Sequence, residues 1–482
     1  MMAVRSGAQY LEGLRDGRAV WYGGERVPDV TTHPAFATGA RAVAQLYDLQ
    51  HVPAYQDTLT FASPKTGEPV GRSFLMPRYA DELIQRRAML EIWAEASCGM
   101  LGQSPDYMNI GLMSLAAARD VFAQADARFG IHILRYYEAC REQDRCLARL
   151  VPDPWPHTGK VDGTSTAPAS HLYVVAQQRE GLVVRGACML ATLAPFADDL
   201  VIYSGAPLQP GDGPRALVCA VPVASPGLSL LCRETVGRTG SRFDHPLASR
   251  FEEMDCVVLF EDVLVPWEQV FLHANVELYN RLESAVRFLW QVGHQVLVRQ
   301  IAKTTLLLGV AHLLSEVIGI AGFLHVQEKL GEVVTYLETL RSCLRRAEVD
   351  AVAIGGVLYP QGDAVHAALR LFPVLYSRML EILQLLGAGG YMMTPGERDL
   401  QSPVAGSIAR YYQGASVPAE RRIQLFRLAW DMVGESFGAR QQLYERYFTG
   451  DPVSLLAARY LHYDKTTAVE RVQALLEASH LS

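Results

Sequence analysis

The sequence predicts an α+β protein that is mainly α, with a small antiparallel β domain between two helical domains. Four short runs rich in Val, Ile, Leu and Tyr lie near the middle of the chain, each bounded by Gly, Pro, Asp or Ser, at 199–203, 216–223, 228–232 and 256–260. Such runs are typical of short strands. Long helical periodicity lies on both sides of them. We therefore expect a helical domain at 1–150, a β domain at 151–275 and a helical bundle with an oligomerisation tail at 276–482.

Composition narrows the class of protein. The 482 residues are enough for two or three hydrophobic cores. The net charge is −7 and no basic block stands out, which argues against nucleic acid or an anionic membrane as a partner. The eight cysteines form no C-x-x-C pair and no zinc-type array, so we expect reduced thiols, no metal and a cytoplasmic location. The N-terminus lacks an apolar core of secretory length, and no uncharged apolar run reaches ~18 residues, so we expect neither a signal peptide nor a membrane span.

The N-terminal region predicts a hairpin and four helices. Gly23-Gly24 lies in a polar, turn-rich stretch that resembles a hairpin. Helical periodicity follows at 37–49, 81–97, 110–125 and 131–150. Glycines and Pro105 make 99–109 a connector between helices. The proline-dense stretch 152–159 cannot be regular structure and marks the boundary with the sheet.

The C-terminal region predicts an antiparallel bundle. Four long amphipathic stretches with few breakers lie at 279–300, 303–319, 323–353 and 360–386. Helices at 421–435 and 452–478 follow. The glycine run 387–390 either ends a helix or contacts a ligand.

Eight segments, in order along the whole chain, closely resemble the 4-hydroxyphenylacetate 3-monooxygenase family, the oxygenase components of two-component flavin hydroxylases. They are 9–18, 30–36, 104–107, 191–195, 249–255, 266–267, 387–392 and 437–446. The resemblance implies an acyl-CoA dehydrogenase-like fold that holds a flavin ring between sheet and helices, in a homotetramer or homodimer. It also implies that a separate flavin reductase supplies FADH2, which reacts with O2 and passes one oxygen atom to a small-molecule substrate. The protein's share would be to bind FAD, exclude water and position the substrate.

The resemblance also assigns residues. Thr192 matches a threonine whose hydroxyl faces the flavin, and Leu190 and Ala191 would line the same edge. Ser204 and Gly205 match a loop that covers the substrate. The remaining cofactor contacts that it implies are Arg149, Leu150, Val151, Pro152, Trp155, Thr158, Gly434, Ser436, Phe437 and Arg440.

These assignments compete with structural roles. The Thr192 hydroxyl could bond only the backbone at a strand end, and Arg440 could form an exposed ion pair. Arg250, Glu252 and Asp255 fit interior polar scaffolding better than catalysis.

Two departures from the family pattern fall in the same pocket. Gln103 stands where the family motif has arginine, so a charged, bidentate donor becomes a neutral amide, while Tyr107 matches. Arg149 stands where the family has a histidine that can take a phenol proton; an arginine stays protonated and cannot be that base. His157 could replace it if the proline-rich loop curls back, or could simply be solvated. The catalytic candidates are Gln103, Tyr107, Arg149 and His157.

The leading hypothesis is a reduced-flavin monooxygenase that hydroxylates or epoxidises a specialised biosynthetic substrate, since epoxidation needs no phenol base. The alternative is a redox-neutral cyclase or pericyclase that reuses the flavin cavity. An iron–sulfur dehydratase would need a second cysteine close to Cys98, which the sequence lacks.

Overall fold

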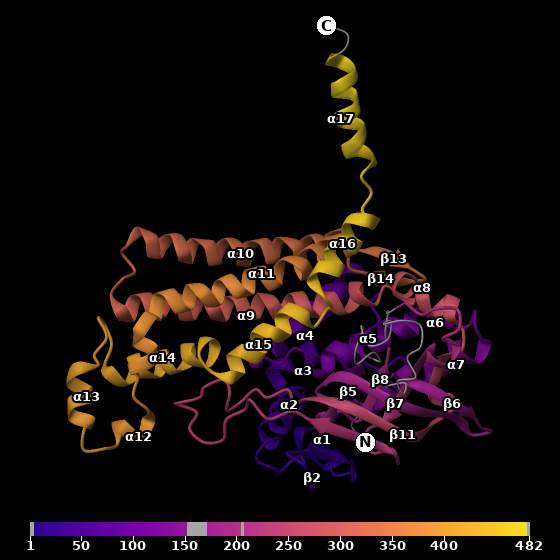
Figure 1. Ribbon diagram of the computed structural model, residues 1–482, viewed down its shortest axis with the longest axis horizontal. Coiled ribbons are helices and arrows are strands. Elements are labelled where there is room, and N and C mark those ends of the chain that lie inside the picture. Colours follow the sequence, from indigo (N-terminus) through magenta and orange to yellow (C-terminus); the bar gives the residue numbers. More distant parts are fainter. Residues whose placement is uncertain (1–3, 152–170, 204–206, 480–482) are drawn as a thin grey trace, which may run out of the picture.

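The computed structural model describes residues 4–151, 171–203 and 207–479. Helices come first, two sheets occupy the middle, and a long helical bundle follows (Figure 1). The predicted α+β, mainly α fold is confirmed. The division at 150 and 275 stays a prediction, because strands from the first 150 residues take part in both sheets.

The N-terminal helices pack around the sheets. The prediction for 37–49 is confirmed, and 81–97 is shifted by one residue. The helices are α1 (Gly7–Gly13), α2 (Ala37–Leu49), α3 (Pro53–Leu59), α4 (Ala80–Ala96), α5 (Pro105–Ala117), α6 (Arg119–Phe122) and α7 (Ala127–Gln143), with the 3-10 turn η1 (Arg72–Phe74).

Two N-terminal predictions were wrong in their boundaries. The connector predicted at 99–109 ends at Ser104, because α5 begins at Pro105; proline suits a first helical turn, where its missing N–H would have no partner. The helix expected to reach 150 ends at Gln143, and β5 (Leu147–Leu150) follows as a strand paired with a segment about fifty residues later.

The hairpin at Gly23-Gly24 is confirmed. The strands β1 (Val20–Tyr22) and β2 (Glu25–Val27) are antiparallel, and the two glycines between them have φ of +61° and +86°. Positive φ at both central residues matches the twist of a two-residue hairpin, which glycine adopts without steric cost.

The predicted central strands are confirmed, but they form two sheets rather than one. A six-stranded sheet has the order β2-β1-β10-β11-β7-β6, and a four-stranded sheet has the order β12-β9-β8-β5. Most pairs in the two sheets are antiparallel, as predicted, while the β1–β10 and β5–β8 pairs are parallel. The bounds are β6 (Tyr173–Gln177), β7 (Gly181–Thr192), β8 (Asp199–Ile202), β9 (Leu217–Pro222), β10 (Leu228–Cys232), β11 (Asp255–Pro266) and β12 (Val270–His273), with the turns η2 (Ala194–Phe196), η3 (Gly213–Arg215) and η4 (Trp267–Gln269).

The helices of the C-terminal bundle begin and end at other residues than predicted. One helix, α9 (Phe288–Ile318), replaces the two predicted around residue 301, and the break falls instead at Arg287, whose φ is +53°. It packs against α4, α10 and α11. The bounds are α8 (Val276–Val286), α10 (Leu324–Val349) and α11 (Gly362–Gly387), and a small hairpin of β13 (Val352–Ile354) and β14 (Val357–Tyr359) follows α10. A second small hairpin, β3 (Thr60–Ala62) with β4 (Pro69–Gly71), lies in the N-terminal region.

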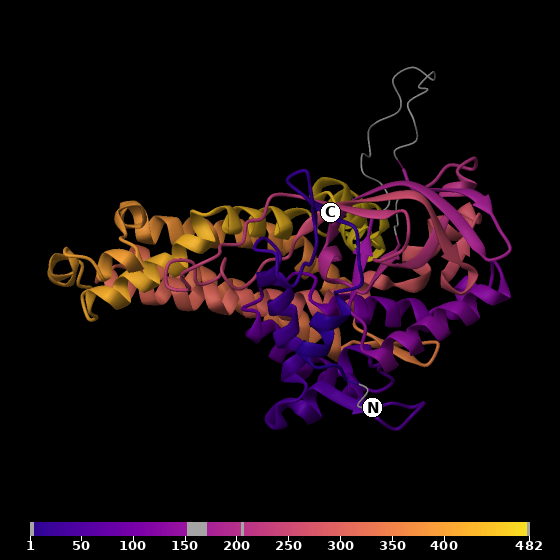
Figure 2. The ribbon, with the colours of Figure 1, turned by 90° about the horizontal axis from the view of Figure 1, so that it is seen from below.

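Smaller helices end the chain, and α17 extends away from the rest of the molecule (Figure 1). Figure 2 shows the helical bundle reaching out to one side of the sheets. They are η5 (Ala388–Met393), α12 (Glu397–Leu400), α13 (Ala405–Tyr411), α14 (Ala419–Val433), α15 (Ser436–Tyr447), α16 (Pro452–His462) and α17 (Thr466–Ser479). The predicted helix at 452–478 is therefore two helices.

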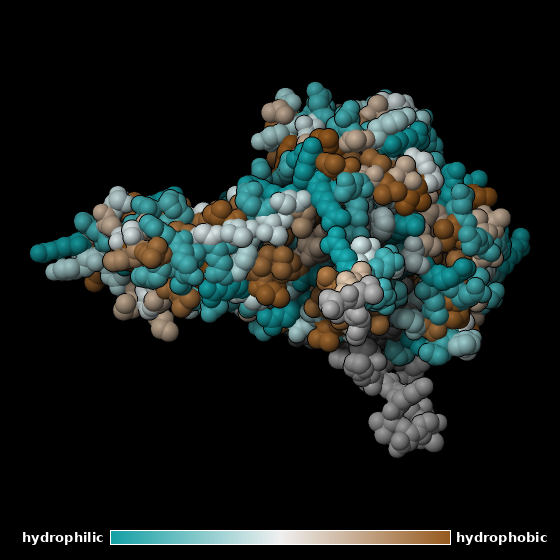
Figure 3. Space-filling model, turned by 90° about the horizontal axis from the view of Figure 1, so that it is seen from above, coloured by the Kyte–Doolittle hydropathy of each residue, from teal (hydrophilic) through white to brown (hydrophobic). Residues whose placement is uncertain are grey.

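Length and composition alone would let two helices, Phe288–Ile318 and Gly362–Met393, cross a membrane. Both belong to the bundle, and 44% and 50% of their most apolar windows are buried inside it. The first also carries buried Arg299 and Lys303. On the face shown in Figure 3, hydrophobic residues lie in small groups among hydrophilic ones. We therefore assign both helices to the core of the bundle.

Candidate functional site

A cavity of about 730 Å³ lies between the sheet and α15. Strands β7, β10 and β11 supply one wall and α15 the other. Most of its lining is apolar, and Thr192, Arg233, Asp255, Arg440 and Tyr444 supply the polar groups. The apolar lining residues are Met189, Leu190, Leu231, Cys232, Cys256, Val257, Leu443, Tyr447 and Phe448. An apolar slot with a few convergent polar groups is the form that small-molecule and cofactor sites take.

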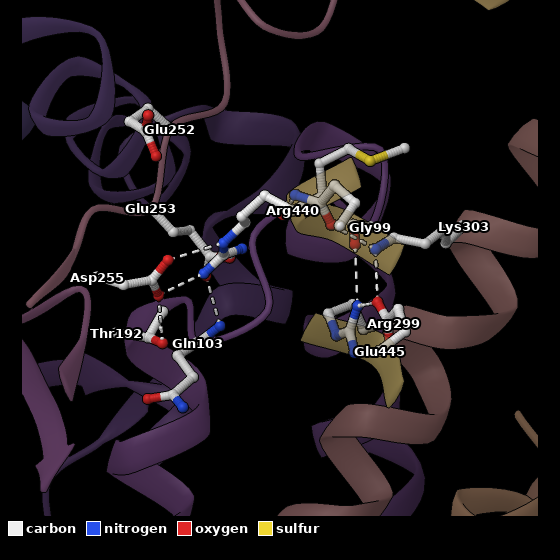
Figure 4. A network of polar contacts seen from close by, with 12 residues as sticks. Gly99, Gln103, Thr192, Glu252, Glu253, Asp255, Arg299, Lys303, Arg440 and Glu445 are labelled. Atoms are coloured by element: carbon white, nitrogen blue, oxygen red, sulfur yellow. Dashed lines mark hydrogen bonds and ion pairs between the residues drawn. The ribbon is translucent and has the colours of Figure 1, made fainter. Parts of the chain in front are cut away.

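Thr192 and Arg440 meet at Asp255 (Figure 4). The Thr192 hydroxyl donates to Asp255 Oδ1 at 2.7 Å. Arg440 donates to both Asp255 oxygens, at 2.7 and 3.0 Å, and to Glu253 Oε2 at 2.8 Å. Glu253 Oε1 in turn accepts the backbone N–H of Gln103 at 2.7 Å. One guanidinium therefore links the end of β7 to the loop before α5.

Opposite charges keep this network ionised. Burial alone would raise the pKa of Asp255, but Arg440 and Arg233 lower it to about 2. Burial alone would lower the pKa of Arg440, but Asp255 and Glu253 raise it well above its usual value. Glu252 accepts a hydrogen bond from Arg233 at 2.9 Å on the far side of Asp255. The interpretation of Glu252 and Asp255 as interior polar scaffolding agrees with these contacts.

A second buried cluster lies beside the first (Figure 4). Glu445 of α15 accepts from Arg299 at 2.5 and 2.9 Å and from Lys303 at 2.5 Å, and all three side chains are essentially inaccessible to water. Burial lowers the pKa of Lys303 to about 8, although Glu445 opposes the shift. Two cations share one carboxylate here, so the cluster has an excess positive charge. Glu253 and Asp255 lie on the other side of Tyr444, whose ring is 4.7 Å from the Arg440 guanidinium carbon and 5.6 Å from that of Arg299.

The two clusters together fix the loop that leads to Tyr107. Its carbonyls at Gly99 and Met100 accept hydrogen bonds from Arg299 and Gln441, and its N–H at Gln103 is held by Glu253. Tyr107 lies in the first turn of α5, immediately after this loop.

The structure brings Tyr107 and Arg149 together, as the resemblance implies. The Tyr107 hydroxyl lies 3.5 Å from Arg149 Nη1, and the Tyr203 carbonyl lies 3.4 Å from Arg149 Nε. The guanidinium carbon is 5.0 Å from the centre of the Phe288 ring and 5.6 Å from that of Tyr203. Burial lowers the pKa of Arg149, but Tyr107, Glu283 and Tyr203 raise it above its usual value. Among the described residues no carboxylate forms an ion pair with Arg149.

Several buried polar atoms near these residues have no hydrogen-bond partner within the described chain: the Tyr444 hydroxyl and the side-chain oxygens of Gln103 and Gln295. Buried polar groups of this kind usually have a partner. All three atoms are inaccessible to water, so they lie within the packed region around the loop and are not open to the cavity.

The other predicted cofactor contacts have mixed surroundings. Leu190 is half-exposed in the cavity wall with φ of +61°, while Ala191 and Leu150 are buried. Val151 forms an isolated bridge with Met189, which lines the cavity.

The contacts expected for the cofactor phosphates, at Gly434 after α14 and on α15, stay predictions, and the structure shows other neighbours for these residues. A Cβ at Gly434 would lie 2.2 Å from the Trp430 ring, so packing already requires glycine there. Phe437 is buried in the core, Ser436 is exposed, and Arg440 is committed to carboxylates. Six predicted residues lie outside the described chain: Pro152, Trp155, His157, Thr158, Ser204 and Gly205.

Sequence reasoning missed Glu253, Tyr444 and Glu445 as parts of this site. A signal for Tyr444 exists, since it lies four residues after Arg440 on α15 and therefore beside it on the helix surface. Asp106 was also missed; burial raises the pKa of its carboxyl to about 6 against the opposing hydrogen bond from Ser104. In the described part of the chain, no group of three or more His, Cys, Asp or Glu is placed to hold a metal ion.

Comparison with known proteins gives consistent matches over the whole chain. Residues 6–272 match the family model described as 4-hydroxyphenylacetate 3-hydroxylase N terminal, and residues 278–477 match the corresponding C-terminal model. The chain is 43% identical, over 99% of its length and 98% of the relative's, to the 4-hydroxyphenylacetate 3-monooxygenase oxygenase component of Thermus thermophilus.

Two further matches bear on the fold and on chemical range. A crystal structure of the oxygenase component of 4-hydroxyphenylacetate 3-monooxygenase complexed with FAD is 42% identical, with a TM-score of 0.94 over 98% of this chain and 99% of that one. The predicted acyl-CoA dehydrogenase-like fold is thereby confirmed. A Streptomyces globisporus monooxygenase that acts on a carrier-bound 3-amino-3-(3-chloro-4-hydroxyphenyl)propanoyl group is 33% identical over 92% of this chain and 85% of its own length.

Proposed function

The chain belongs to the 4-hydroxyphenylacetate 3-hydroxylase family, and from its pocket we propose that it hydroxylates or epoxidises a specialised biosynthetic substrate. It is the oxygenase component of a two-component monooxygenase, which uses FAD reduced by a separate flavin reductase. The resemblance inferred from eight short segments is confirmed.

The cavity beside Thr192 suits FAD. Its walls are apolar, as a flat aromatic ring requires, and its volume of about 730 Å³ is in the range of cofactor sites. Tyr444 contributes its ring to the cavity wall, while its hydroxyl is buried away from the cavity. We propose that Leu190, Ala191 and Thr192 hold the ring from the sheet side and α15 covers the other side. When bound and reduced, FAD supplies the electrons that activate O2. The chain's own contribution is to exclude water, which the buried network behind Thr192 supports.

The observation that carries the proposed substrate class is the Arg149 guanidinium beside the Tyr107 hydroxyl. A guanidinium donates hydrogen bonds and cannot accept a proton near neutral pH. It therefore does not act as the base for a neutral phenol. It can bind a substrate oxygen that already carries negative charge, and its long contacts of 3.4 and 3.5 Å leave its donors available for a better acceptor. A phenol ionised in solution, or an alkene held through a carboxylate, fits such a group.

The alternative is a redox-neutral cyclase or pericyclase in the same cavity. Gln103 and Arg149, the two departures from the family pattern, favour it, because neither serves phenol hydroxylation in the usual way. The polar network around Thr192 favours the oxygenase, since a cavity used only for its shape has no need of a buried ion cluster.

The deciding experiment combines the purified protein, FAD, NADH, a flavin reductase and ¹⁸O₂ with a panel of phenols and alkenes. We expect one ¹⁸O atom in the product by mass spectrometry. Product without ¹⁸O, or turnover without oxygen and reductant, would replace the oxygenase with the cyclase.

We propose that the enzyme is a homotetramer or homodimer in the cytoplasm. Exposed apolar residues on α16 and α17, among them Leu456, Tyr460, Val472 and Leu475, favour contact with a second copy. All eight cysteines are free thiols, which suits a reducing compartment. Removing residues 451–482 should lower the number of subunits, measured by light scattering as the ratio of the assembly's mass to that of one shortened chain; an unchanged number would exclude the tail from the interface.

A further inference from the structure

Thr192 and Asp255 are paired across the two strands that form the cavity wall. Their Cα atoms are register partners in the antiparallel β7–β11 pair, and both residues line the cavity. The two side chains lie 2.7 Å apart, between Thr192 Oγ1 and Asp255 Oδ1. The hydrogen that joins these oxygens has to come from one of them.

The carboxylate cannot supply that hydrogen. Asp255 accepts four hydrogen bonds: from Thr192 and Arg440 on Oδ1, and from Arg440 and Arg233 on Oδ2. The neighbouring carboxylates, Glu252 and Glu253, are themselves paired with Arg233 and Arg440. The two arginines hold the pKa of Asp255 at about 2 although burial opposes them, so it is ionised at neutral pH and accepts only.

The hydroxyl of Thr192 therefore has a fixed polarity. A hydroxyl has one hydrogen to donate and two lone pairs to accept with. With its hydrogen bonded to Asp255, Thr192 can offer only an acceptor to a molecule in the cavity. Arginine N–H groups fill the other three acceptor positions of the carboxylate and so hold Asp255 in place as the partner of the hydroxyl.

We propose that Asp255, oriented by Arg440, is a positioning residue that makes Thr192 an obligate acceptor and so biases the cavity toward reduced FAD. This inference rests on the proposed function, in which FAD occupies this cavity. The reduced isoalloxazine carries an N–H at N5 of its central ring, where the oxidised ring has a bare nitrogen with a lone pair. An acceptor in the wall satisfies the reduced ring, whereas it faces a lone pair of the oxidised ring and leaves it without a partner.

Such a bias suits an enzyme that receives its cofactor reduced and has to release it oxidised. A single hydrogen bond that only one form can make corresponds to a difference in affinity of about tenfold, within the range of 5–150-fold typical of coupling between two states. For a two-electron couple, about tenfold equals a shift of about 30 mV in the midpoint potential of bound FAD relative to free FAD.

The test measures the dissociation constants of oxidised FAD and of dithionite-reduced FAD, the latter without oxygen. The variants are Thr192→Val, Thr192→Ser and Asp255→Asn. We expect the preference for reduced FAD to fall about tenfold in Thr192→Val and Asp255→Asn and to stay within about twofold in Thr192→Ser. Asp262→Asn is the matched control, because Asp262 lies on the same strand, pairs with Arg185 at the surface and should leave the preference unchanged.

Each outcome has one meaning. An unchanged preference for reduced FAD in Thr192→Val overturns the inference. If Asp255→Asn does not fold, Thr192→Val still tests the inference, because it leaves the Arg440–Asp255 pair intact. Equal loss of affinity for both forms means that Thr192 only fills space and also overturns it. If the wild-type protein binds neither form of FAD, the proposed function fails instead.

Discussion

The two sides of the site are built differently. On the cofactor side, Thr192, Asp255, Arg440 and Glu253 are joined by charge-assisted hydrogen bonds of 2.7 to 3.0 Å. On the substrate side, Arg149 has contacts of 3.4 and 3.5 Å with neutral groups. Short bonds between buried charges fix a geometry before any ligand arrives, whereas long bonds to a buried cation leave binding capacity unused.

The difference follows from two requirements. The cofactor is the same in every turnover, whereas each substrate needs a pocket of its own shape and charge. A flavin has to be held in the same way for every substrate, so a rigid flavin site does not limit the range of substrates. The acceptor carbon differs from one substrate to another, and a single change at Arg149 alters the charge of the pocket without touching the network behind Thr192. Four predictions test this contrast.

The largest effect should follow from removing the shared carboxylate of the second cluster. Glu445→Gln leaves Arg299 and Lys303 buried without a counter-charge, so we expect a loss of about 3–5 kcal/mol in the free energy of unfolding. Urea unfolding of the FAD-free protein measures it. Glu381→Gln, at an exposed partner of Arg378, is the control and should cost at most about 1 kcal/mol. Equal losses in the two variants would show that the buried cluster is not what holds the loop.

On the substrate side, Arg149→Met should act on catalysis and not on the cofactor. We expect kcat/KM for ionised phenols to fall about tenfold to a hundredfold, the value of a hydrogen bond to a charged group, with FAD affinity within about twofold of the wild type. Steady-state rates with phenols of graded acidity measure it. Arg149→His should shift the preference toward un-ionised phenols, because histidine can accept a proton. Arg135→Met, at an exposed arginine of α7, is the control. A matching fall in FAD affinity would contradict the separation of the two sides.

The two sides should also differ in their response to pH. Asp106 beside Tyr107 has its pKa raised to about 6 by burial, whereas Asp255 has its pKa lowered to about 2. Ionising Asp106 costs the folded state, so its penalty is present above pH 6 and disappears as pH falls toward 4; Asp255 loses its contribution only as pH falls through about 2. Between pH 7 and 5, kcat/KM should change with a midpoint near 6 while FAD affinity stays constant.

Asp106→Asn should remove that inflection and stabilise the protein at pH 7 by about 1–2 kcal/mol, with little effect at pH 4. Thermal unfolding at the two pH values measures the second part. An inflection that survives in Asp106→Asn would assign the titration to the substrate or to another group.

What the sequence could predict follows from how local each feature is. The hairpin at Gly23-Gly24 and the helix Ala37–Leu49 depend on neighbours a few residues away, and both were predicted correctly. The strand β5 was read as the end of a helix because its partner β8 is some fifty residues distant, and nothing in Leu147–Leu150 itself distinguishes the two. The break at Arg287 carries neither Gly nor Pro, so no local signal marked it.

The same distinction between near and distant sequence partners applies to the residues of the site. The proximity of Tyr107 and Arg149 followed from the family resemblance, and the structure agrees with it. The partners of Arg440 did not follow, because Asp255 and Glu253 lie more than 180 residues away in sequence. An arginine in a helix shows its charge in the sequence but not whether a phosphate or a carboxylate will neutralise it.

The smallest effect should come from Glu253→Gln, which bears on a direct tie between the two sides, the hydrogen bond to the Gln103 N–H. The amide can accept from Gln103 N–H or from Arg440, but it lacks the charge that favours both at once. We expect KM for the substrate to rise about threefold to tenfold, corresponding to a neutral hydrogen bond of about 0.5–1.5 kcal/mol, with kcat nearly unchanged. Hydrogen exchange should speed up at the Gln103 amide. Glu252→Gln is the matched control, because Glu252 holds the N–H groups of Val236 and Gly237 instead, so faster exchange should appear there and not at Gln103. If Glu253→Gln changed FAD affinity and left the Gln103 amide protected, the loop would be held by Arg299 and Gln441 alone, and the two sides would be independent.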